Sequence, residues 1–329
     1  MIGRIGGNIE DGRIVALCGG IGGAKLALGL SKVVAPERLT VVVNTADDFR
    51  HFGLHVSPDI DTVCYTLAGV SNTEFGWGRA GESWRFMEAV KELGGESWFA
   101  LGDTDLATSA VRTGRFERGD TLTQITGDIA RALGVKATIL PASDDRLATV
   151  VHTDEGVLPF QHYFVGRHCQ PRVNALSLSG IETAQPSPQL VAALNDERLA
   201  VVILCPSNPY LSIDPILALP GVRETLRNLQ VPIIAVSPLV GNDAIKGPLR
   251  KLMGELGHEV SLQSIADHYG DFLDVLVIDQ VDGDAVVTGP RVEVAQTIMT
   301  SLDERIELAR HVLAIARDHA VAHPKAGLT

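Results

Sequence analysis

The sequence predicts an α/β fold with a Rossmann-like, mostly parallel sheet, helices on both faces and a smaller antiparallel or helical extension. Two observations support this prediction. Short apolar runs rich in β-branched residues alternate with helical patterns along most of the chain, and these runs are apolar at nearly every position. Strands that are buried on both faces have this character, and such strands form parallel sheets covered by helices.

Each expected element follows from its local pattern. The expected strands are the β-branched runs Ile14–Cys18, Leu39–Asn44, Trp98–Leu101, Ala137–Leu140, Ala148–His152, Leu199–Cys205, Pro232–Ser237 and Leu273–Asp279. The expected helices between them include Gly23–Val33, Glu82–Leu93, Leu122–Leu133, Val222–Leu229, Pro248–Leu256 and Ser301–His319. The regular succession of strand and helix predicts a mostly parallel sheet covered on both faces.

One segment departs from this succession. Between about residues 146 and 180, the strand-like pieces "LATVVHT", "FQHYFVG" and "RVNALSLS" follow one another with no helix between them. This pattern predicts a β-rich antiparallel insert within a single domain that spans residues 13–329. Residues 1–12 carry no strong pattern, and we expect a loose leader there.

Composition narrows the function. The 329-residue chain is 45% hydrophobic and 21% charged, which is typical of a globular protein. Its formal net charge of -12 disfavours nucleic acid and anionic membranes as partners. The four cysteines form no C-x-x-C pair, so neither a zinc knuckle nor a disulfide framework is indicated. With no apolar run of roughly 18–20 residues and no signal-like start, we expect a cytoplasmic protein.

A glycine-rich turn follows the first strand. Gly19, Gly20, Gly22 and Gly23 precede Lys25 in "CGGIGGAKLALGL". Such a turn lets backbone approach a phosphate while the helix start offers N–H groups, although a tight turn without a ligand is the alternative. Lys25 stands where G-x-G-x-x-G needs glycine, and no Gly-Lys-Ser/Thr occurs here, so an NAD site and a Walker P-loop are both disfavoured.

Four carboxylates follow the second strand, Asp47 and Asp48 in "NTADDF" and Asp59 and Asp61 in "SPDIDT". Like charges this close repel, which suggests a cation. Hard oxygen ligands suit Mg²⁺, which takes one or two carboxylates together with waters and phosphate oxygens. The alternative is structural: Asp59 could cap its own helix, and Asp47 and Asp48 could form a turn.

Polar loops follow the later strands as well. In an open α/β sheet, ligands bind outside the carboxyl ends of the strands, so these loops predict one shared cleft. The candidate residues in them are Gly102 and Asp103 in "LGDTDL", Ser207 and Asn208 in "CPSNPY", and Ser237 and Asn242 in "SPLVGNDAIKGP".

Taken in order, these loops resemble one family. The stretches "GGIGGAKLALGL", "VVVNTADDF", "SPDIDTVCYTLAG", "WGRAGESW", "LGDTDLAT", "PSNPYLSI" and "VSPLVGNDAIKGP" are similar to those of the 2-phospho-L-lactate transferases of coenzyme F420 biosynthesis. The resemblance implies a Rossmann-like homodimer that uses Mg²⁺ as cofactor. It also implies transfer of a phospho-acid unit from a guanosine-diphospho donor to the ribityl hydroxyl of FO (7,8-didemethyl-8-hydroxy-5-deazariboflavin), with release of GMP. The acid could be phospholactate, phosphoenolpyruvate or 3-phosphoglycerate.

The resemblance also implies roles for individual residues. Asp61 and Asp48 are the expected catalytic residues, Asp61 meets the FO hydroxyl, and Asp47, Asp48 and Asp61 are the expected metal ligands. Further FO contacts fall on Ala100, Gly102 and Asp103, although some members carry a lysine where this chain has Ala100. The expected donor contacts are Gly19, Gly20, Gly22, Gly23, Lys25, Ser207, Asn208, Ser237 and Asn242.

Two other classes compete with this hypothesis. A non-catalytic nucleotide-sugar-binding regulator, resembling the gluconeogenesis-factor family, shares the glycine turn and the Ala-Asp-Asp stretch. Its relatives continue with Gly/Ser-rich residues, whereas this chain continues with "FRHFG" and then "PDIDT". An NAD(P) oxidoreductase is disfavoured by Lys25 and by Asn44, which stands where the second strand of such enzymes ends in an acidic residue.

Overall fold

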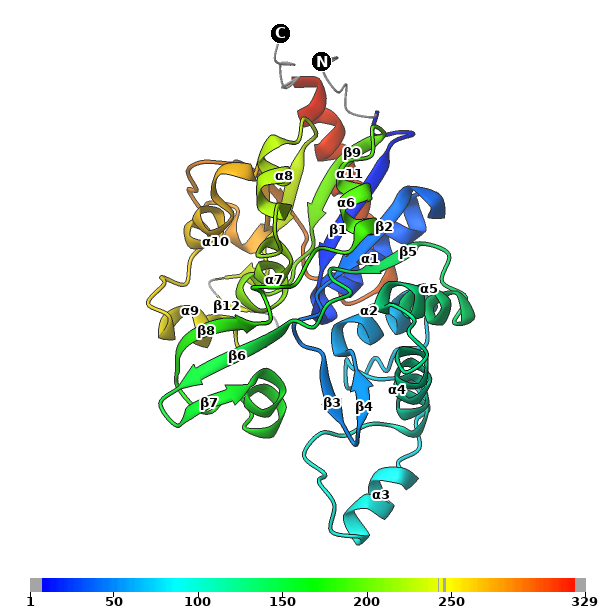
Figure 1. The fold of residues 1–329 in the computed structure, drawn as a ribbon. Helices are drawn as coiled ribbons and strands as arrows, with labels where there is room; N and C mark the ends of the chain where they lie inside the picture. Colours follow the sequence, from blue (N-terminus) through cyan, green and yellow to red (C-terminus); the bar gives the residue numbers. More distant parts are fainter. Residues whose placement is uncertain (1–7, 242, 245–246, 323–329) are drawn as a thin grey trace.

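The computed structural model describes residues 8–241, 243–244 and 247–322. Within them, the main feature is a seven-stranded sheet with the order β14-β13-β10-β9-β1-β2-β5 (Figure 1). Every neighbouring pair in it is parallel. Its strands are β1 (Arg13–Cys18), β2 (Leu39–Val43), β5 (Thr138–Pro141), β9 (Leu199–Leu204), β10 (Ile233–Val236), β13 (Val275–Asp279) and β14 (Arg291–Ala295). The predicted parallel α/β sheet is thereby confirmed.

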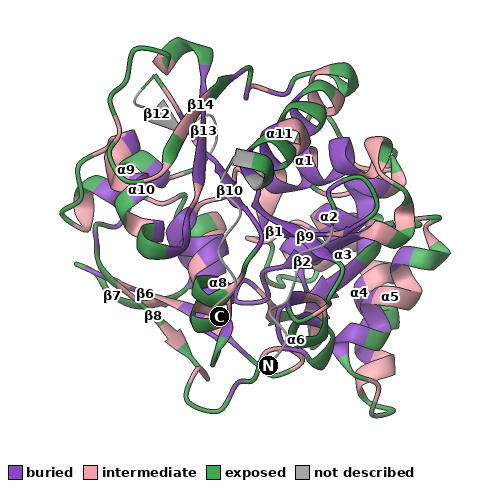
Figure 2. Ribbon diagram, turned by 90° about the horizontal axis from the view of Figure 1, so that it is seen from above, coloured by how far each residue is buried: buried purple, intermediate pink, exposed green. Residues whose placement is uncertain are grey.

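Helices cover both faces of the sheet, and side chains along each strand alternate between two apolar cores. In β1, Ile14 and Ala16 face one core, whereas Val15 and Leu17 face the other. The first core contains residues of α1 (Gly20–Val33), α2 (Pro58–Ala68), α5 (Leu122–Ala132) and α11 (Leu302–Ala322). The second contains residues of α6 (Pro188–Leu194), α7 (Asp214–Leu217), α8 (Val222–Asn228), α9 (Leu249–Glu255) and α10 (Leu262–Tyr269). Figure 2 shows the buried strands between the two helical layers.

Smaller antiparallel elements flank the main sheet. The strands β6 (Ala148–Thr153), β7 (Gly156–Pro159) and β8 (Val173–Ser179) form a three-stranded sheet within the segment where the sequence predicts a β-rich insert. A hairpin of β3 (Phe49–His51) and β4 (Leu54–Val56) follows β2, and β11 (Leu239–Val240) pairs with β12 (Asp243–Ala244). The helices α3 (Arg85–Glu92) and α4 (Asp103–Phe116) lie on the same side of the molecule as the β3–β4 hairpin (Figure 1).

The expected strand at Trp98–Leu101 is wrong. This segment has no strand pairing, and its aromatic side chains pack on the β3–β4 hairpin instead. The ring of Phe99 lies 4.7 Å from that of Phe49, and the ring of Trp98 lies 5.3 Å from that of His51. Aromatic residues favour strands, but here their burial comes from ring packing rather than from a place in the sheet.

Part of the expected loose leader is packed. Residues 8–12 form a turn in which the Gly12 N–H donates to the Asn8 carbonyl at 2.6 Å. The Arg38 side chain donates to the carbonyls of Ile9 and Gly12. These contacts tie the turn to the start of β2. Separately, no helix of residues 8–241, 243–244 and 247–322 combines the length and apolar character that crossing a membrane requires.

The connection order places a topological switch point at the carboxyl end of β1. From β1 the chain proceeds to β2 and β5 on one side of the sheet, and later to β9, β10, β13 and β14 on the other side. The loops that leave β1 and β9 therefore diverge over opposite halves of the sheet. Ligands of open α/β sheets bind at such a switch point.

Candidate active site

The glycine turn after β1 is held by two neighbouring loops. Gly20 adopts a left-handed conformation, with φ of +62°. Its N–H donates to Asp59 Oδ1 at 2.8 Å, and the Gly19 N–H donates to Ser207 Oγ at 3.1 Å. The Ser207 hydroxyl in turn donates to the Gly19 carbonyl at 2.9 Å. The turn is therefore joined to the loop after β9 and to the first turn of α2.

The other glycines are required by close packing within the protein. A Cβ atom on Gly22 would lie 2.3 Å from the Pro206 carbonyl oxygen, and one on Gly23 would lie 2.5 Å from Ser207 Oγ. A Cβ on Gly19 would lie 2.4 Å from Asp59 Oδ2. The sheet-facing side of the turn is therefore filled by protein atoms. The start of a helix leaves backbone N–H groups without an intrahelical partner, and these are the groups that an anion binds.

Asp59 organises the site rather than capping its own helix. Its Oδ2 accepts a hydrogen bond from Asn44 Nδ2 at 3.0 Å, and Asn44 Oδ1 accepts from the Ala46 N–H at 2.9 Å. Asp59 thus links the Gly20 turn to the end of β2. Burial raises the pKa of Asp59 to about 6, and hydrogen bonds from Asn44 and Gly20 oppose that rise. The structural alternative of a helix cap is thus wrong for α2, although the same carboxylate does bind the first N–H of α1.

Asp48 lies close enough to both Asp47 and Asp61 to affect them electrostatically. Burial is the main cause that raises the pKa of Asp47, and the charges of Asp59 and Asp48 add to it. Asp48 Oδ2 accepts from the Ser57 hydroxyl at 2.7 Å and lies 3.0 Å from His55 Nε2. One buried oxygen on each of three carboxylates has no hydrogen-bond partner; these atoms are Asp47 Oδ1, Asp48 Oδ1 and Asp61 Oδ2.

Asp61 is paired with Arg112 of α4, a residue to which the sequence analysis assigns no role. The Arg112 side chain is 1% exposed, and its Nη2 donates to Asp61 Oδ1. Its Nη1 donates to the His55 carbonyl at 3.3 Å. Burial raises the pKa of Asp61, while the Arg112 charge opposes that rise. A buried guanidinium is thus the counter-ion of the expected catalytic carboxylate.

A further buried carboxylate lies along the same two helices. Tyr65 of α2 donates its hydroxyl hydrogen to Asp105 Oδ1 of α4 at 2.8 Å. Burial raises the pKa of Asp105 to about 7, with the Asp61 charge as the next cause. Glu82, from the loop before α3, accepts from the Asp105 N–H at 2.9 Å and also from Thr104. These residues were missed because their partners lie far away in the sequence.

Several expected donor contacts are engaged elsewhere. Lys25 Nζ donates to the Met299 carbonyl at 2.7 Å, on the partly exposed side of α1. Asn208 Oδ1 accepts from the N–H groups of the second and third residues after it, and the Ser237 hydroxyl bonds to the backbone two residues later. Asn242 lies outside the described residues. Of the expected donor contacts, the glycines and Ser207 form the core of the site.

Among the described residues, no hydrogen bond or ion pair joins the expected FO contacts at 100–103 to Asp61. Asp103 begins α4, and its carboxylate binds the segment at the start of α3. Arg112, which reaches Asp61, lies near the opposite end of α4. Gly102 packs directly against the Glu82 side chain. In the described part of the chain, no group of three or more His, Cys, Asp or Glu side chains is arranged to hold a metal ion by itself.

The sequence is similar to those of known proteins over most of its length. The sequence model of a family described as "2-phospho-L-lactate transferase CofD" matches residues 14–317. The chain is 39% identical over 304 residues to the 2-phospho-L-lactate transferase of Methanosarcina mazei, covering 91% of this chain and 99% of that protein. It is also 39% identical over 315 residues to the phosphoenolpyruvate transferase of Kitasatospora aureofaciens, covering 92% and 98%.

A solved structure shares the fold. A member of the UPF0052 family from Bacillus halodurans superposes with a TM-score of 0.61 at 14% identity, covering 92% of this chain and 98% of that one. At this identity the likeness concerns the fold alone.

Proposed function

This chain belongs to the 2-phospho-L-lactate transferase CofD family, and we propose that it transfers a phospho-acid unit from a guanosine-diphospho donor to FO, with release of GMP. The acid is 2-phospholactate, phosphoenolpyruvate or 3-phosphoglycerate; relatives named for the first two are similarly close to this chain. The observation that carries the proposal is the group of buried carboxylates beside the glycine turn, with three oxygen atoms that lack partners.

The chain's own residues divide the work of the reaction. The N–H groups at the start of α1 bind the donor phosphates, and Asp59 fixes the turn that presents them. The FO ribityl oxygen attacks the phosphorus that carries the acid, and the bond to the GMP oxygen breaks with its electron pair leaving on GMP. The hydroxyl proton passes to Asp61 Oδ2, whose raised pKa makes the carboxylate a better base than an exposed one.

The carboxylates also fit Mg²⁺. Asp47 Oδ1 and Asp48 Oδ1 are buried oxygen atoms without hydrogen-bond partners. Asp61 Oδ2 cannot bind the ion while it accepts the proton, so Asp61 is assigned to the proton. Carboxylate oxygens are hard ligands, and waters and the donor's phosphate oxygens would complete the shell, because Mg²⁺ takes few protein ligands. When bound, Mg²⁺ supplies charge neutralisation at the diphosphate. Ser57 and His55 hold Asp48 in place through its other oxygen.

The test is mass spectrometry of FO after incubation with the protein, Mg²⁺ and the three guanosine-diphospho donors in competition. A mass gain of one acid unit is expected, and its value identifies the preferred donor. Asp48→Asn should abolish the gain, whereas Asp284→Asn, at an exposed position, should keep it. If FO stays unchanged while the donors remain intact, the proposed reaction is wrong.

A further inference from the structure

The loop after β9 lies directly against the glycine turn. This loop contains the π-helical turn η3 (Pro209–Ile213). A Cβ atom on Gly19 would lie 2.7 Å from Ser212 Cβ, so η3 and the glycine turn are in close contact. The Leu211 carbonyl of η3 also accepts a hydrogen bond from Asn44 Nδ2 at 3.3 Å. A shift of η3 would therefore move the glycine turn or leave a gap beside it.

The end of η3 is tied to α10. Asp214 follows η3 directly, and His268 lies in the last turn of α10. His268 Nε2 lies 2.8 Å from Asp214 Oδ1. An ionised carboxylate can only accept a hydrogen bond, so this ring nitrogen donates. The side chains of His268 and Asp214 are 16% and 33% exposed, and a charge-assisted hydrogen bond in such a partly shielded place is stronger than one at the open surface.

A ring contact adds to this bond. The Tyr210 side chain of η3 is buried, and its ring meets that of His268 edge to face, with 4.6 Å between the centroids. His258 stacks on the same tyrosine, with 5.5 Å between the centroids. Aromatic rings in these arrangements attract one another beyond the area that they bury. His268 therefore holds η3 both through Tyr210 and through Asp214.

His268 is itself fixed by α8. Arg223 Nη2 donates to the carbonyls of His268 and Tyr269, at 3.0 and 3.2 Å. These carbonyls belong to the end of α10, where a cation is favourable. The guanidinium also lies over the Phe272 ring, 5.0 Å from its centroid. The anchor of η3 is thus built on two helices that pack in the second core.

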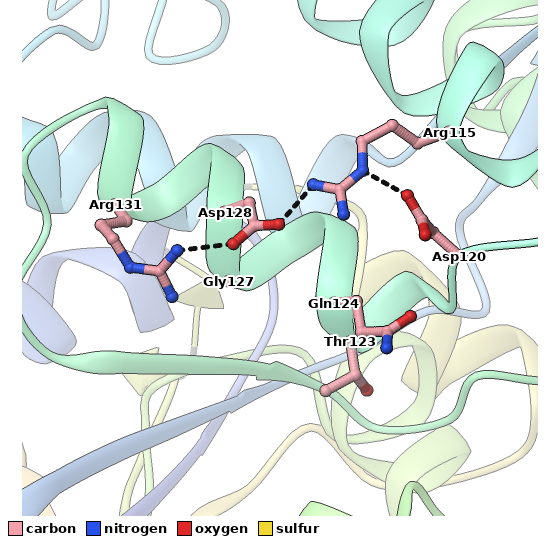
Figure 3. A pocket seen from close by; sticks show the side chains of 7 residues that line it. All are labelled: Arg115, Asp120, Thr123, Gln124, Gly127, Asp128 and Arg131. Atoms are coloured by element: carbon pink, nitrogen blue, oxygen red, sulfur yellow. Dashed lines mark hydrogen bonds and ion pairs between the residues drawn. The ribbon is translucent and has the colours of Figure 1, made fainter. Parts of the chain in front are cut away.

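Another group of ion pairs reaches less far. Arg115 binds Asp120 at 2.6 Å and Asp128 at 2.5 Å, beside a cavity of about 320 Å³ between α4 and α5 (Figure 3). These pairs join neighbouring parts of the chain and support the packing of α5 on α4. His268 and Asp214 are 54 positions apart, and their bond ends at a loop that touches the glycine turn.

We propose that His268 is a positioning residue for the donor: through Asp214 and Tyr210 it holds η3 against the glycine turn and so raises the affinity for a nucleoside diphosphate. The inference rests on the proposed function, which assigns the donor phosphates to this turn. His268 does not touch the turn itself and acts only through η3. The FO hydroxyl is assigned to Asp61, which is paired with α4 rather than with η3. Loss of His268 should therefore affect the donor and spare FO.

The test is steady-state kinetics of two His268 variants. His268→Phe keeps a ring against Tyr210 but cannot donate to Asp214, whereas the amide nitrogen of His268→Gln can. We expect His268→Phe to raise the KM for the guanosine-diphospho donor about threefold to tenfold, because a charge-assisted hydrogen bond is lost. The kcat and the KM for FO should not change, since the lost contact serves the bound donor and the transition state alike. His268→Gln should restore most of the donor KM.

Arg227→Gln is the matched control. Arg227 of α8 binds Asp271 at 2.8 Å, the same distance as in the His268–Asp214 pair, but the two side chains are 47% and 62% exposed. This variant should have wild-type kinetics. If it raises the donor KM as much as His268→Phe does, or if His268→Phe leaves the donor KM unchanged, the proposal is wrong. An equal rise in the KM for FO would also overturn it, because the fold would then be loosened in general.

Calorimetry with guanosine diphosphate separates this proposal from the transferase reaction. The wild type should bind the nucleotide, and His268→Phe should weaken that binding by a factor similar to the change in KM. If binding depends on His268 in this way but FO gains no mass, the positioning role stands and the proposed reaction is wrong. If FO is converted but His268→Phe binds guanosine diphosphate as tightly as the wild type, the reaction stands and the positioning role is wrong.

A second variant keeps the test independent of the histidine ring. Asp214→Asn keeps an acceptor oxygen for His268 but loses the charge, so it should raise the donor KM by a smaller factor than His268→Phe. The double variant should raise the donor KM no further than His268→Phe alone, because both changes act on one bond. Effects that multiply would contradict the link. Thermal denaturation gives the temperature below which each variant is folded, and the kinetics are compared there.

Discussion

Asp59 accepts a hydrogen bond at 2.8 Å from the backbone N–H of Gly20, which lies 39 positions earlier in the chain. This bond fixes the open turn that begins α1. The same carboxylate accepts from the Asn44 side chain at 3.0 Å, so one buried group joins the ends of β1 and β2. The position of the glycine turn therefore depends on a residue of α2.

Replacing Asp59 should loosen this turn. Asp59→Ala leaves the Gly20 N–H and the Asn44 amide without their acceptor, which should lower the free energy of unfolding by about 1–3 kcal/mol. Asp59→Asn keeps one acceptor oxygen for the two donors, so its free energy of unfolding should lie between those of the wild type and Asp59→Ala. Urea denaturation measures both, with exposed Asp284→Ala as the control. A denaturation midpoint for Asp59→Ala equal to that of the control would contradict the role.

The Asp61–Arg112 pair should behave as one unit. Removing one partner leaves a buried charge uncompensated, so Arg112→Gln and Asp61→Asn should each lower the free energy of unfolding by about 3–5 kcal/mol. The double variant should lose clearly less than the sum of the two. A double-mutant cycle in urea measures this coupling, and strict additivity would argue against it. Loss of turnover in an Asp61 variant must therefore be judged only where the protein remains folded.

The sheet could be predicted from the sequence because its strands are buried on both faces. Runs such as Leu39–Val43 and Leu199–Leu204 are apolar at nearly every position, which local composition reveals. The edge strand β14 was missed because its residues alternate between charged and apolar and remain half-exposed. The segment Trp98–Leu101 gave the opposite error, a predicted strand that the structure lacks. Its aromatic and apolar residues are typical of a strand, but their rings pack on the β3–β4 hairpin instead.

The site could be predicted only in its parts that follow strands directly. The glycine turn and the carboxylates after β2 stand in loops whose position comes from the sheet. The partners of those groups do not follow from any local pattern. Arg112 lies 51 positions from Asp61, and Asp105 lies 40 positions from Tyr65, so only the packing of α4 on α2 brings them together.

Gly22 should tolerate no side chain. Gly22→Ala would bring a Cβ within 2.3 Å of the Pro206 carbonyl oxygen, and the required shift should cost about 1–3 kcal/mol. Gly127, inside α5, has no heavy atom within 4 Å of the corresponding position. Gly127→Ala should instead stabilise the protein by roughly 0.5–1 kcal/mol. Thermal denaturation of the two variants measures this difference in sign, and equal melting temperatures would contradict the packing.

Asp105 should make the stability of the protein depend on pH. Its pKa is about 7 in the folded protein and ordinarily 3.8, mainly because burial disfavours the charged form. Between these two values the folded state binds more protons than the unfolded state, so stability is greatest below about pH 4 for this group and falls as the pH rises to 7. The full loss above pH 7 is at most roughly 4 kcal/mol.

Asp105→Asn removes this loss while keeping an oxygen that can accept the Tyr65 hydroxyl hydrogen. The variant should therefore be more stable than the wild type at pH 8 and no more stable at pH 4. Urea denaturation at a series of pH values measures the difference between the two proteins. Because every other titrating group is shared, that difference reports Asp105 together with its electrostatic coupling to Asp61 and Glu82. A constant difference from pH 4 to pH 8 would show that the Asp105 carboxyl does not change its protonation in this window.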